Sequence, residues 1–247
     1  MKYTSKLILN WTEYEFGAGW GGWWWTPWAN TLLYLPIDNS DTSSIVYDNS
    51  WKWNNANWYW TAQYETLSSW KRILSFSWSQ WLYLWTKLLT DQPYTIVMRV
   101  QKNWRQSDDA TIVSNQRDGW YYWQVISFNL SDQVYTLYGN GSNAWLTMTD
   151  VLTFDNDIWI QYTVTVDWNI IRKYVNWQLV QTVTNSQAPA FANATNLSIW
   201  YLQSNWSVSN FRFFKWKIWE LIIETWKRDE QSITDYYNQT KSLYGIS

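Results

Sequence analysis

The chain has 247 residues, a formal net charge of −2, no cysteine and no histidine. This composition excludes a disulfide framework, a thiolate site, a Ser-His-Asp triad and a histidine-based metal centre. The slightly negative net charge does not favour binding to nucleic acid. No stretch approaches 18 consecutive apolar residues, so no membrane insertion is expected, and no apolar run of signal-peptide length is visible at the N-terminus.

Residues 1–16 are predicted to hold a small β-hairpin. Leu7 and Leu9 alternate with polar neighbours, Tyr14 and Phe16 do the same, and Asn10-Trp11 lies between the two runs. A two-stranded hairpin is marginal alone, so we expect it to dock on another surface, for example on a neighbouring copy.

Residues 17–30 are predicted to be a flexible linker, because tryptophan stands where glycine belongs. The chain holds 26 tryptophans and only eight glycines. Tryptophan also follows Asn or Asp where a tight hairpin turn requires glycine with a positive φ. These pairs are Asn10-Trp11, Asn57-Trp58, Asn103-Trp104, Asp167-Trp168, Asn176-Trp177 and Asn205-Trp206.

We interpret most of these tryptophans as glycines of the natural protein, as would follow from a UGA codon that the source reads as glycine. The alternative is a chain that is truly rich in tryptophan. Trp120, Trp123 and Trp159 are retained as tryptophans, Trp159 because it lies in a strand pattern where an aromatic residue belongs. The interpretation predicts that Trp159 is largely buried. It also predicts exposed turn positions for Trp58, Trp104, Trp168, Trp177 and Trp206.

Residues 31–247 are predicted to form one all-β domain that ends in a short helix. Twelve short strands separated by turn signals favour a sandwich or barrel. They are expected at 31–37, 72–76, 80–84, 94–101, 110–115, 121–129, 133–139, 159–167, 170–175, 178–184, 196–201 and 217–225. The helix is expected at 229–239, with Asp229 as its N-cap and Ile233, Tyr236 and Tyr237 on its apolar side.

Four stretches of this domain resemble the concanavalin A-like, laminin G-like (LamG-like) jelly-roll group when glycine replaces tryptophan. They are 32–38 with 48–57 ("D-x-S-G-x-G-N-x-A"), 74–84 ("L-x-F-x-G-x-x-x-Y-x"), 159–168 with 172–180 ("W-x-H-x-A-x-T-x-D-G" and "x-Y-V-N-G-x-L-V"), and 197–200 with 214–223 ("L-x-I-G" and "F-x-G-x-I-x-E-x-x-I"). The usual histidine of the third motif is Gln161 here. The resemblance covers about 31–240 and implies a concanavalin A-like jelly-roll β-sandwich with a short C-terminal helix, after the hairpin and a Gly-rich linker.

Members of this fold bind glycans or proteins through rim loops, sometimes with calcium. Aromatic side chains stack on sugar faces, so the candidate ligand residues are Arg117, Asp118, Trp120, Tyr121 and Trp123. The alternative is that alternate members of this run pack in the core, because 121–128 also reads as a strand. Calcium is the one cofactor that the resemblance implies, and its candidate ligands are Asp38, Asp48, Asp108 and Asp109. Each of these could instead be an ordinary turn residue.

The sequence therefore predicts a non-catalytic binding module for a glycan or a surface protein. Hairpin, linker and jelly roll suit the anchor, tether and head of a phage or prophage appendage or a bacterial adhesin, located on a virion, on the cell surface or outside the cell. A homo-oligomer and a purely structural decoration domain stay open. A glycoside hydrolase of the same fold is disfavoured, because Glu220 and Glu224 share a strand without the Glu-x-Asp-x-x-Glu signature.

Overall fold

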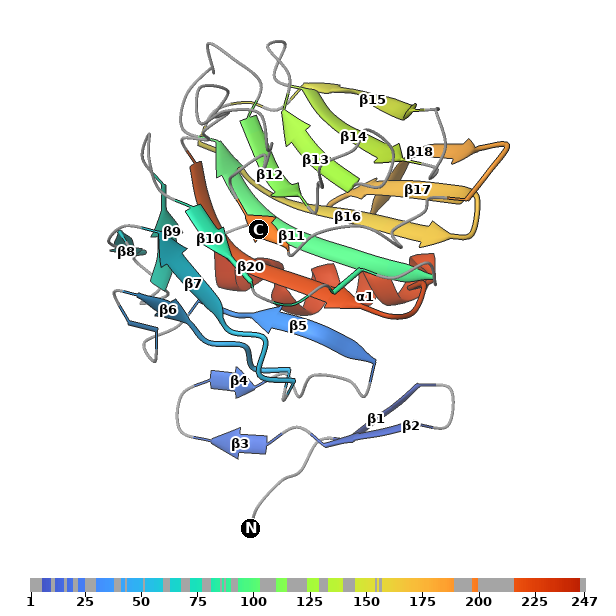
Figure 1. The fold of residues 1–247 in the computed structure, drawn as a ribbon. Helices are drawn as coiled ribbons and strands as arrows, with labels where there is room; N and C mark the ends of the chain where they lie inside the picture. Colours follow the sequence, from blue (N-terminus) through green and yellow to red (C-terminus); the bar gives the residue numbers. More distant parts are fainter. Residues whose placement is uncertain are drawn as a thin grey trace.

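The protein is a two-layered β-sandwich with one C-terminal helix, as the computed structural model shows (Figure 1). Most of its strands lie in two large antiparallel sheets whose inner faces enclose a single apolar core. The structure describes residues 6–9, 12–15, 17–19, 22–24, 30–37, 41–42, 44–50, 52–59, 63–67, 72–76, 81–84, 86, 88–89, 93–102, 110–114, 124–128, 133–139, 145–153, 155, 157–188, 197–199 and 216–244. The predicted all-β sandwich with a short C-terminal helix is confirmed.

Sheet I is the eight-stranded sheet that carries the green and yellow strands in the upper part of Figure 1. In spatial order its strands are β15 (Trp145–Thr153), β14 (Gln133–Gly139), β13 (Gln124–Phe128), β12 (Ala110–Ser114), β19 (Ser198–Ile199), β10 (Trp81–Tyr83), β7 (Ala56–Tyr59) and β6 (Ile45–Val46).

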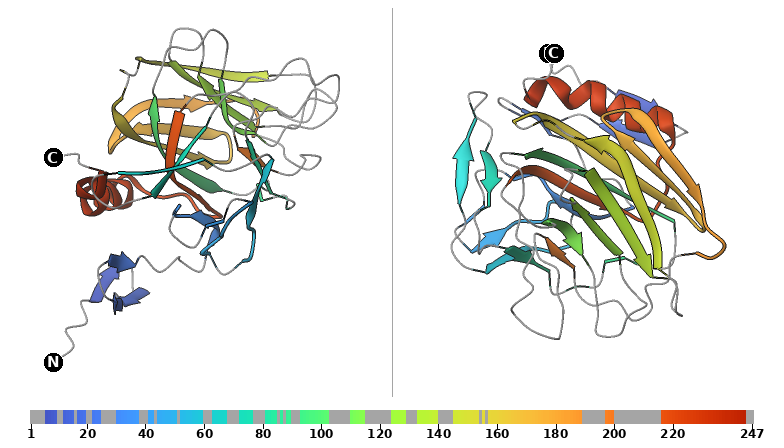
Figure 2. Two further views of the ribbon diagram at one scale, coloured as in Figure 1. Left: turned by 90° about the vertical axis from the view of Figure 1, so that its left-hand side faces the viewer. Right: turned by 90° about the horizontal axis from the view of Figure 1, so that it is seen from above.

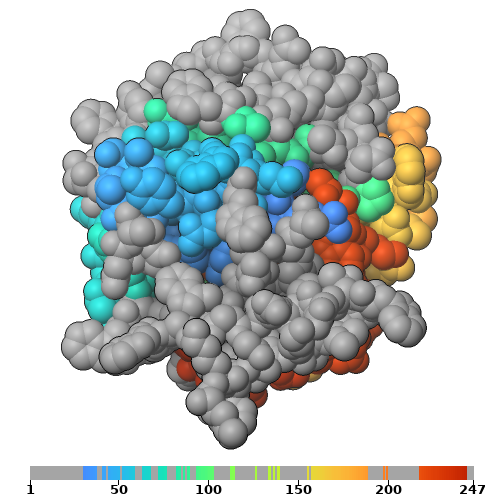
Figure 3. All heavy atoms as spheres, turned by 90° about the horizontal axis from the view of Figure 1, so that it is seen from below, coloured from blue at the N-terminus to red at the C-terminus, as the bar shows by residue number. Residues whose placement is uncertain are grey.

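Sheet II faces it and is built around three strands of nine residues each, β11 (Tyr94–Lys102), β16 (Trp159–Asp167) and β20 (Trp216–Glu224). Its order is β18 (Gln178–Thr184), β17 (Ile170–Val175), β16, β11, β20, β9 (Arg72–Ser75) and β8 (Tyr64–Thr66), with β5 (Thr31–Leu35) also paired to β20. The β5–β20 pairing brings the 30–60 segment beside 216–244, and the two lie side by side on the lower surface (Figure 3).

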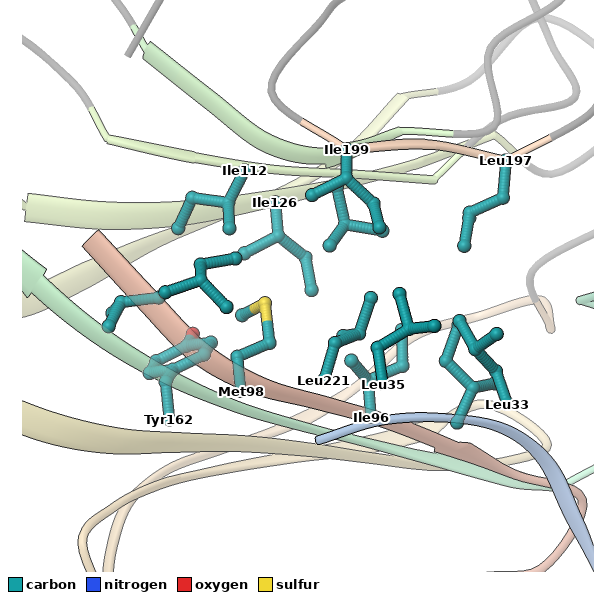
Figure 4. Close-up of a cluster of buried hydrophobic side chains, with 14 of the residues drawn as sticks. Leu33, Leu35, Ile96, Met98, Ile112, Ile126, Tyr162, Leu197, Ile199 and Leu221 are labelled. Carbon is teal, nitrogen blue, oxygen red and sulfur yellow. The ribbon is translucent and has the colours of Figure 1, made fainter. Parts of the chain in front are cut away.

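The core lies between the two sheets and is made of alternating strand residues (Figure 4). On β5, Thr31, Leu33 and Leu35 are buried while Leu32 and Tyr34 are half-buried, which is the period of two expected for a strand with one face on a core. The core-facing side chains drawn and labelled in Figure 4 are Leu33, Leu35, Ile96, Met98, Ile112, Ile126, Tyr162, Leu197, Ile199 and Leu221.

The central strands β11 and β16 are buried on both faces. Their inner residues join the core, whereas the outer residues of β11, such as Val97 and Arg99, lie beneath helix α1 (Glu230–Thr240). The helix begins where Asp229 Oδ1 accepts the backbone N–H of Ser232 at 2.7 Å, so the predicted N-cap is confirmed. A short 3₁₀ turn, η2 (Lys241–Tyr244), follows it. Figure 2 shows α1 against the outside of the sandwich.

The N-terminal segment forms two short antiparallel pairs. The first joins β1 (Lys6–Leu9) to β2 (Thr12–Glu15), where the sequence predicts the hairpin. The second joins β3 (Gly17–Gly19) to β4 (Gly22–Trp24) and lies inside the segment that the sequence predicts to be a linker. The division of the chain into 1–16, 17–30 and 31–247 stays a prediction.

Candidate functional site

Residues 48–55 form a loop, here called the Asp48 loop, which is held together by hydrogen bonds to the carboxylate of Asp48, one of the candidate calcium ligands. Asp48 is buried, and its Oδ1 accepts the backbone N–H groups of Tyr34 and Ser50, each at 2.9 Å. Its Oδ2 accepts the Ser50 hydroxyl at 2.7 Å and the Asn54 N–H at 2.8 Å. Asn54 Nδ2 donates to the carbonyl of Leu32 at 2.8 Å. The carboxylate therefore ties the loop to β5, and both of its oxygens already have protein donors.

Beside this loop lies an aromatic cluster that rests on Trp58. The Trp58 ring is stacked on Phe76, with 5.0 Å between ring centroids, and its Nε1 donates to the Tyr64 hydroxyl at 3.4 Å. Arg72 lies 3.6 Å from the centroid of Tyr64 and donates from Nη1 to the carbonyl of Asp41 at 2.9 Å. These contacts join β7, β8 and β9 at one end of the sandwich.

The prediction that Trp58 is an exposed turn residue is wrong, because only 7% of it is exposed. The residue belongs to β7, which pairs with both β6 and β10, and its position in the alternation directs the ring inward with Ala56. The Asn57-Trp58 pair resembles a turn signal, but it lies within a strand.

A buried polar network holds α1 on the outer face of sheet II. Arg99 is 2% exposed; its Nη2 donates to Gln161 Oε1 at 3.0 Å and also to the Thr240 hydroxyl, and its Nη1 lies 3.3 Å from Glu220 Oε2. Tyr236 donates its hydroxyl to the same Glu220 oxygen at 2.5 Å. Because Arg99 binds partners on β16, β20 and α1, it fixes the position of the helix on the sheet.

A second buried pair lies at the other end of the helix. Arg228 donates from Nε and Nη2 to the two carboxylate oxygens of Glu224, both at 2.7 Å, in the bidentate geometry typical of strong arginine–carboxylate pairs. The Tyr236 ring lies between the two guanidiniums, 4.6 Å from Arg99 and 4.7 Å from Arg228. Burial, followed by the nearby charge of Glu220, raises the pKa of Tyr236 well above its ordinary value, so its hydroxyl stays a donor.

Glu220 and Glu224 have structural partners in the buried network. Both carboxylates are buried and paired with arginines under α1, so neither is placed to act on a sugar. Among the described residues, no group of three or more His, Cys, Asp or Glu side chains is arranged to hold a metal ion.

The sequence-predicted ligand residues Arg117, Asp118, Trp120, Tyr121 and Trp123 lie outside the described residues, as do Asp38, Asp108 and Asp109. Asp48 is the one metal candidate that the structure places, and it organises its loop as described above. The calcium site and the aromatic ligand surface therefore stay predictions.

The other tryptophan predictions that fall on described residues are confirmed. Trp159 is 8% exposed and contributes to the core, whereas Trp168 and Trp177 are 58% and 40% exposed in the turns after β16 and β17. Trp104 and Trp206 lie outside the described residues.

Sequence reasoning missed the network around Arg99, although one signal was present. Arg99 is the single charge inside the apolar run Tyr94–Lys102 before its last residue. A charged residue in a strand that is otherwise buried indicates a buried polar or charged partner.

No family model and no curated protein matches the chain. Solved structures do match. One is the binding domain of botulinum neurotoxin DC in complex with rat synaptotagmin II, with a TM-score of 0.66 and 13% identity over 87% of this chain and 52% of that one. The same binding domain in complex with SialylT gives a TM-score of 0.66 at 12% identity, over 87% of this chain and 52% of that one.

A third match is domain 4 of AbnA, an extracellular GH43 arabinanase from Geobacillus stearothermophilus, in complex with arabinotriose. Its TM-score is 0.64 at 15% identity, and it covers 83% of this chain and 97% of that one. The chain thus spans about half the length of the neurotoxin domains and nearly all of the arabinanase domain. At such low identity these matches show a shared fold, that of β-sandwich binding domains. No helix among the described residues has the length and apolar character needed to cross a membrane.

Proposed function

We propose that this chain is a non-catalytic binding module that uses its rim loops to bind a glycan or a surface protein. The observation that carries the proposal is the likeness of the whole sandwich to domains solved with an arabinotriose, with SialylT and with synaptotagmin II. A rigid two-sheet scaffold suits this task because it holds rim loops in fixed positions. The burial and pairing of Glu220 and Glu224 support a role without catalysis.

The finer form of the proposal is a LamG-like jelly roll at the head of a phage or prophage appendage or of a bacterial adhesin, located on a virion, on a cell surface or outside the cell. The order of hairpin, linker and sandwich supports it, because it suits an anchor, a tether and a head. Light scattering after gel filtration tests this setting. A trimer favours a fibre component, whereas a monomer that binds a glycan favours a free module.

The same proposal includes glycine in the natural protein at most of the positions where this chain has tryptophan. It is supported by the four LamG-like motifs, each of which has tryptophan at a glycine position. Its general test is the mass of the protein isolated from its own cells, together with peptide sequencing across 45–85. Glycine at the motif positions 51, 53 and 78 is expected, and tryptophan there would contradict the recoding.

The direct test of function is a glycan array combined with a search for bound surface proteins. We expect Trp120→Ala, Tyr121→Ala and Trp123→Ala each to weaken binding at least tenfold, because stacked aromatic rings supply the anchors of a sugar site. Leu179→Ala is the matched control, since Leu179 is an exposed apolar residue on edge strand β18. Equal loss in the control, or no binding to any glycan or protein, would contradict the proposal. Titration with calcium and with a chelator shows whether binding needs the ion.

A further inference from the structure

Two tryptophans of the described chain adopt a backbone conformation that suits glycine. Trp53 has φ 61° and Trp168 has φ 54°. They are also the two most exposed large apolar side chains among the described residues, at 82% and 58%. A bulky residue in the left-handed region is a genuine outlier, whereas glycine enters it freely.

The geometry around Trp168 is set by its neighbours rather than by its indole. Asp167 pairs with Ile170 at the end of the β16–β17 hairpin, which leaves a two-residue turn of Trp168 and Asn169. The Asn169 side chain donates to the carbonyl of Asn185 at 2.8 Å, and Lys227 lies 2.6 Å from Asp167. A positive φ at the first turn residue is the type II′ pattern, which takes glycine at that position.

The backbone conformation of Trp53 is likewise set by its neighbours in the Asp48 loop. The chain must reverse after Lys52 so that the Asn54 N–H reaches Asp48 Oδ2 at 2.8 Å and the Asn54 amide reaches the carbonyl of Leu32 at 2.8 Å. The positive φ at residue 53 makes that reversal, while its indole points into solvent.

Other tryptophans differ from these two. Trp159 and Trp58 are buried in strands, at 8% and 7% exposure. At the Asn176-Trp177 turn the positive φ falls on Asn176, at 58°, and the Trp177 ring packs 4.7 Å from Tyr237. Only residues 53 and 168 therefore combine a tryptophan, a left-handed backbone and a solvent-facing ring in the described part of the chain.

We infer that residues 53 and 168 are glycine in the natural protein, and that these two loop tips present no aromatic anchor to its ligand. The inference rests on the recoding and the binding role proposed above, but its own support is the backbone at these two positions. If the protein is produced with tryptophan at 53 and 168, these exposed indoles can bind other molecules non-specifically.

The first test is peptide mass spectrometry of the protein isolated from its own cells. We expect glycine at 53 and 168 and tryptophan at 159. Tryptophan at 53 or at 168 overturns the inference.

The second test introduces Trp53→Gly and Trp168→Gly, singly, into the protein that has tryptophan at both positions. Each change should raise Tm by about 2–4 °C, because it relieves a left-handed conformation that disfavours any side chain. Trp159→Ala is the contrasting variant and should lower Tm, because it empties a buried site. A fall in Tm for either glycine variant contradicts the inference.

A glycan array on the double glycine variant separates this inference from the proposed function. Specific binding kept in the double variant agrees with both. Specific binding that disappears with the two indoles overturns the inference while it supports a binding role. A rise in Tm without binding by any form supports the inference and contradicts the proposed function.

Discussion

At the scale of single residues, the Asp48 carboxylate accepts hydrogen bonds from the backbone N–H groups of Tyr34, Ser50 and Asn54 and from the Ser50 hydroxyl. Asp48→Ala leaves the N–H groups of Tyr34, Ser50 and Asn54 without their acceptor. We expect a loss of about 2–4 kcal/mol in the free energy of unfolding, measured with urea. Asp155→Ala is the control, because Asp155 is exposed, and it should change stability by less than about 0.5 kcal/mol. Equal effects would show that the Asp48 hydrogen bonds carry no net stability.

Glu65 gives a pH-dependent prediction on the surface. Burial alone would raise the pKa of Glu65, but the hydrogen bonds from Lys217 and Ser75 lower it below its ordinary value. A carboxylate with a lowered folded-state pKa stabilises the fold above the unfolded pKa, and this contribution disappears as pH falls through the folded pKa. Because the Glu65 side chain is 44% exposed, the contribution is less than about 1 kcal/mol.

The measurement is an NMR titration of the Glu65 carboxyl carbon. We expect Lys217→Met to raise the pKa of Glu65 and to flatten the small loss of stability in acid. An unchanged pKa would mean that the 2.6 Å contact between Lys217 Nζ and Glu65 Oε2 does not persist in solution.

At the scale of elements, the seat of α1 depends on Arg99. Arg99→Met leaves the Glu220 carboxylate buried without its cation, so we expect a loss of about 3–5 kcal/mol. Hydrogen exchange should show α1 amides exposed sooner than those of β11 and β16. The double variant Arg99→Met with Glu220→Gln removes both charges and should recover part of the loss. A double variant as unstable as the single one would show that shape, rather than charge, holds the helix.

Which elements the sequence could predict depends on how local their signals are. Strands β16, β17 and β18 agree with the prediction at both ends, because their alternation is clear and two short turns separate them. Helix α1 was predicted to within one residue at each end, because the cap residue Asp229 marks its start. Strands β6 and β8 were missed because two or three residues are too few to show a period. Strand β15 was also missed, although Leu146 and Met148 alternate with threonines.

The candidate site was less predictable than the fold. Arg99 and Thr240 are 141 residues apart, and no local pattern links them. The aromatic candidates at 117–123 lie outside the described residues and stay a prediction. Trp58 was misassigned because a two-residue turn signal does not show that strands pair on both sides of it.

At the scale of the whole molecule, the strand pairings of the described residues before Asn30 are local to that segment. Strand β1 pairs with β2 and β3 with β4, whereas β5 pairs with β20 and the carbonyl of Asn30 accepts the Thr225 N–H at 2.9 Å. We expect a chain without residues 1–28 to unfold in one cooperative transition, within about 1 kcal/mol of the full chain by urea and circular dichroism.

Removal of residues 1–35 is the contrasting truncation. It deletes β5 with the buried Leu33 and Leu35. The residues of β20 from Leu221 to Glu224 then lose their partner on that side, while β9 still pairs with Lys217 and Ile218. We expect this shorter chain not to fold, because the burial of each leucine contributes about 1.5–3 kcal/mol in addition to the lost strand pairing. A folded product would show that the 30–35 segment is dispensable and that the domain boundary lies further along the chain.

The burial of β11 on both faces has a consequence for how this protein can change over time. Arg99 on that strand is matched to Gln161, Glu220, Tyr236 and Thr240, which come from the second half of the chain. A chimera that joins the first 150 residues to the second half of another sandwich would inherit the arginine without its counterparts. We therefore expect viable recombinants to keep the middle strand and the C-terminal helix from the same parent.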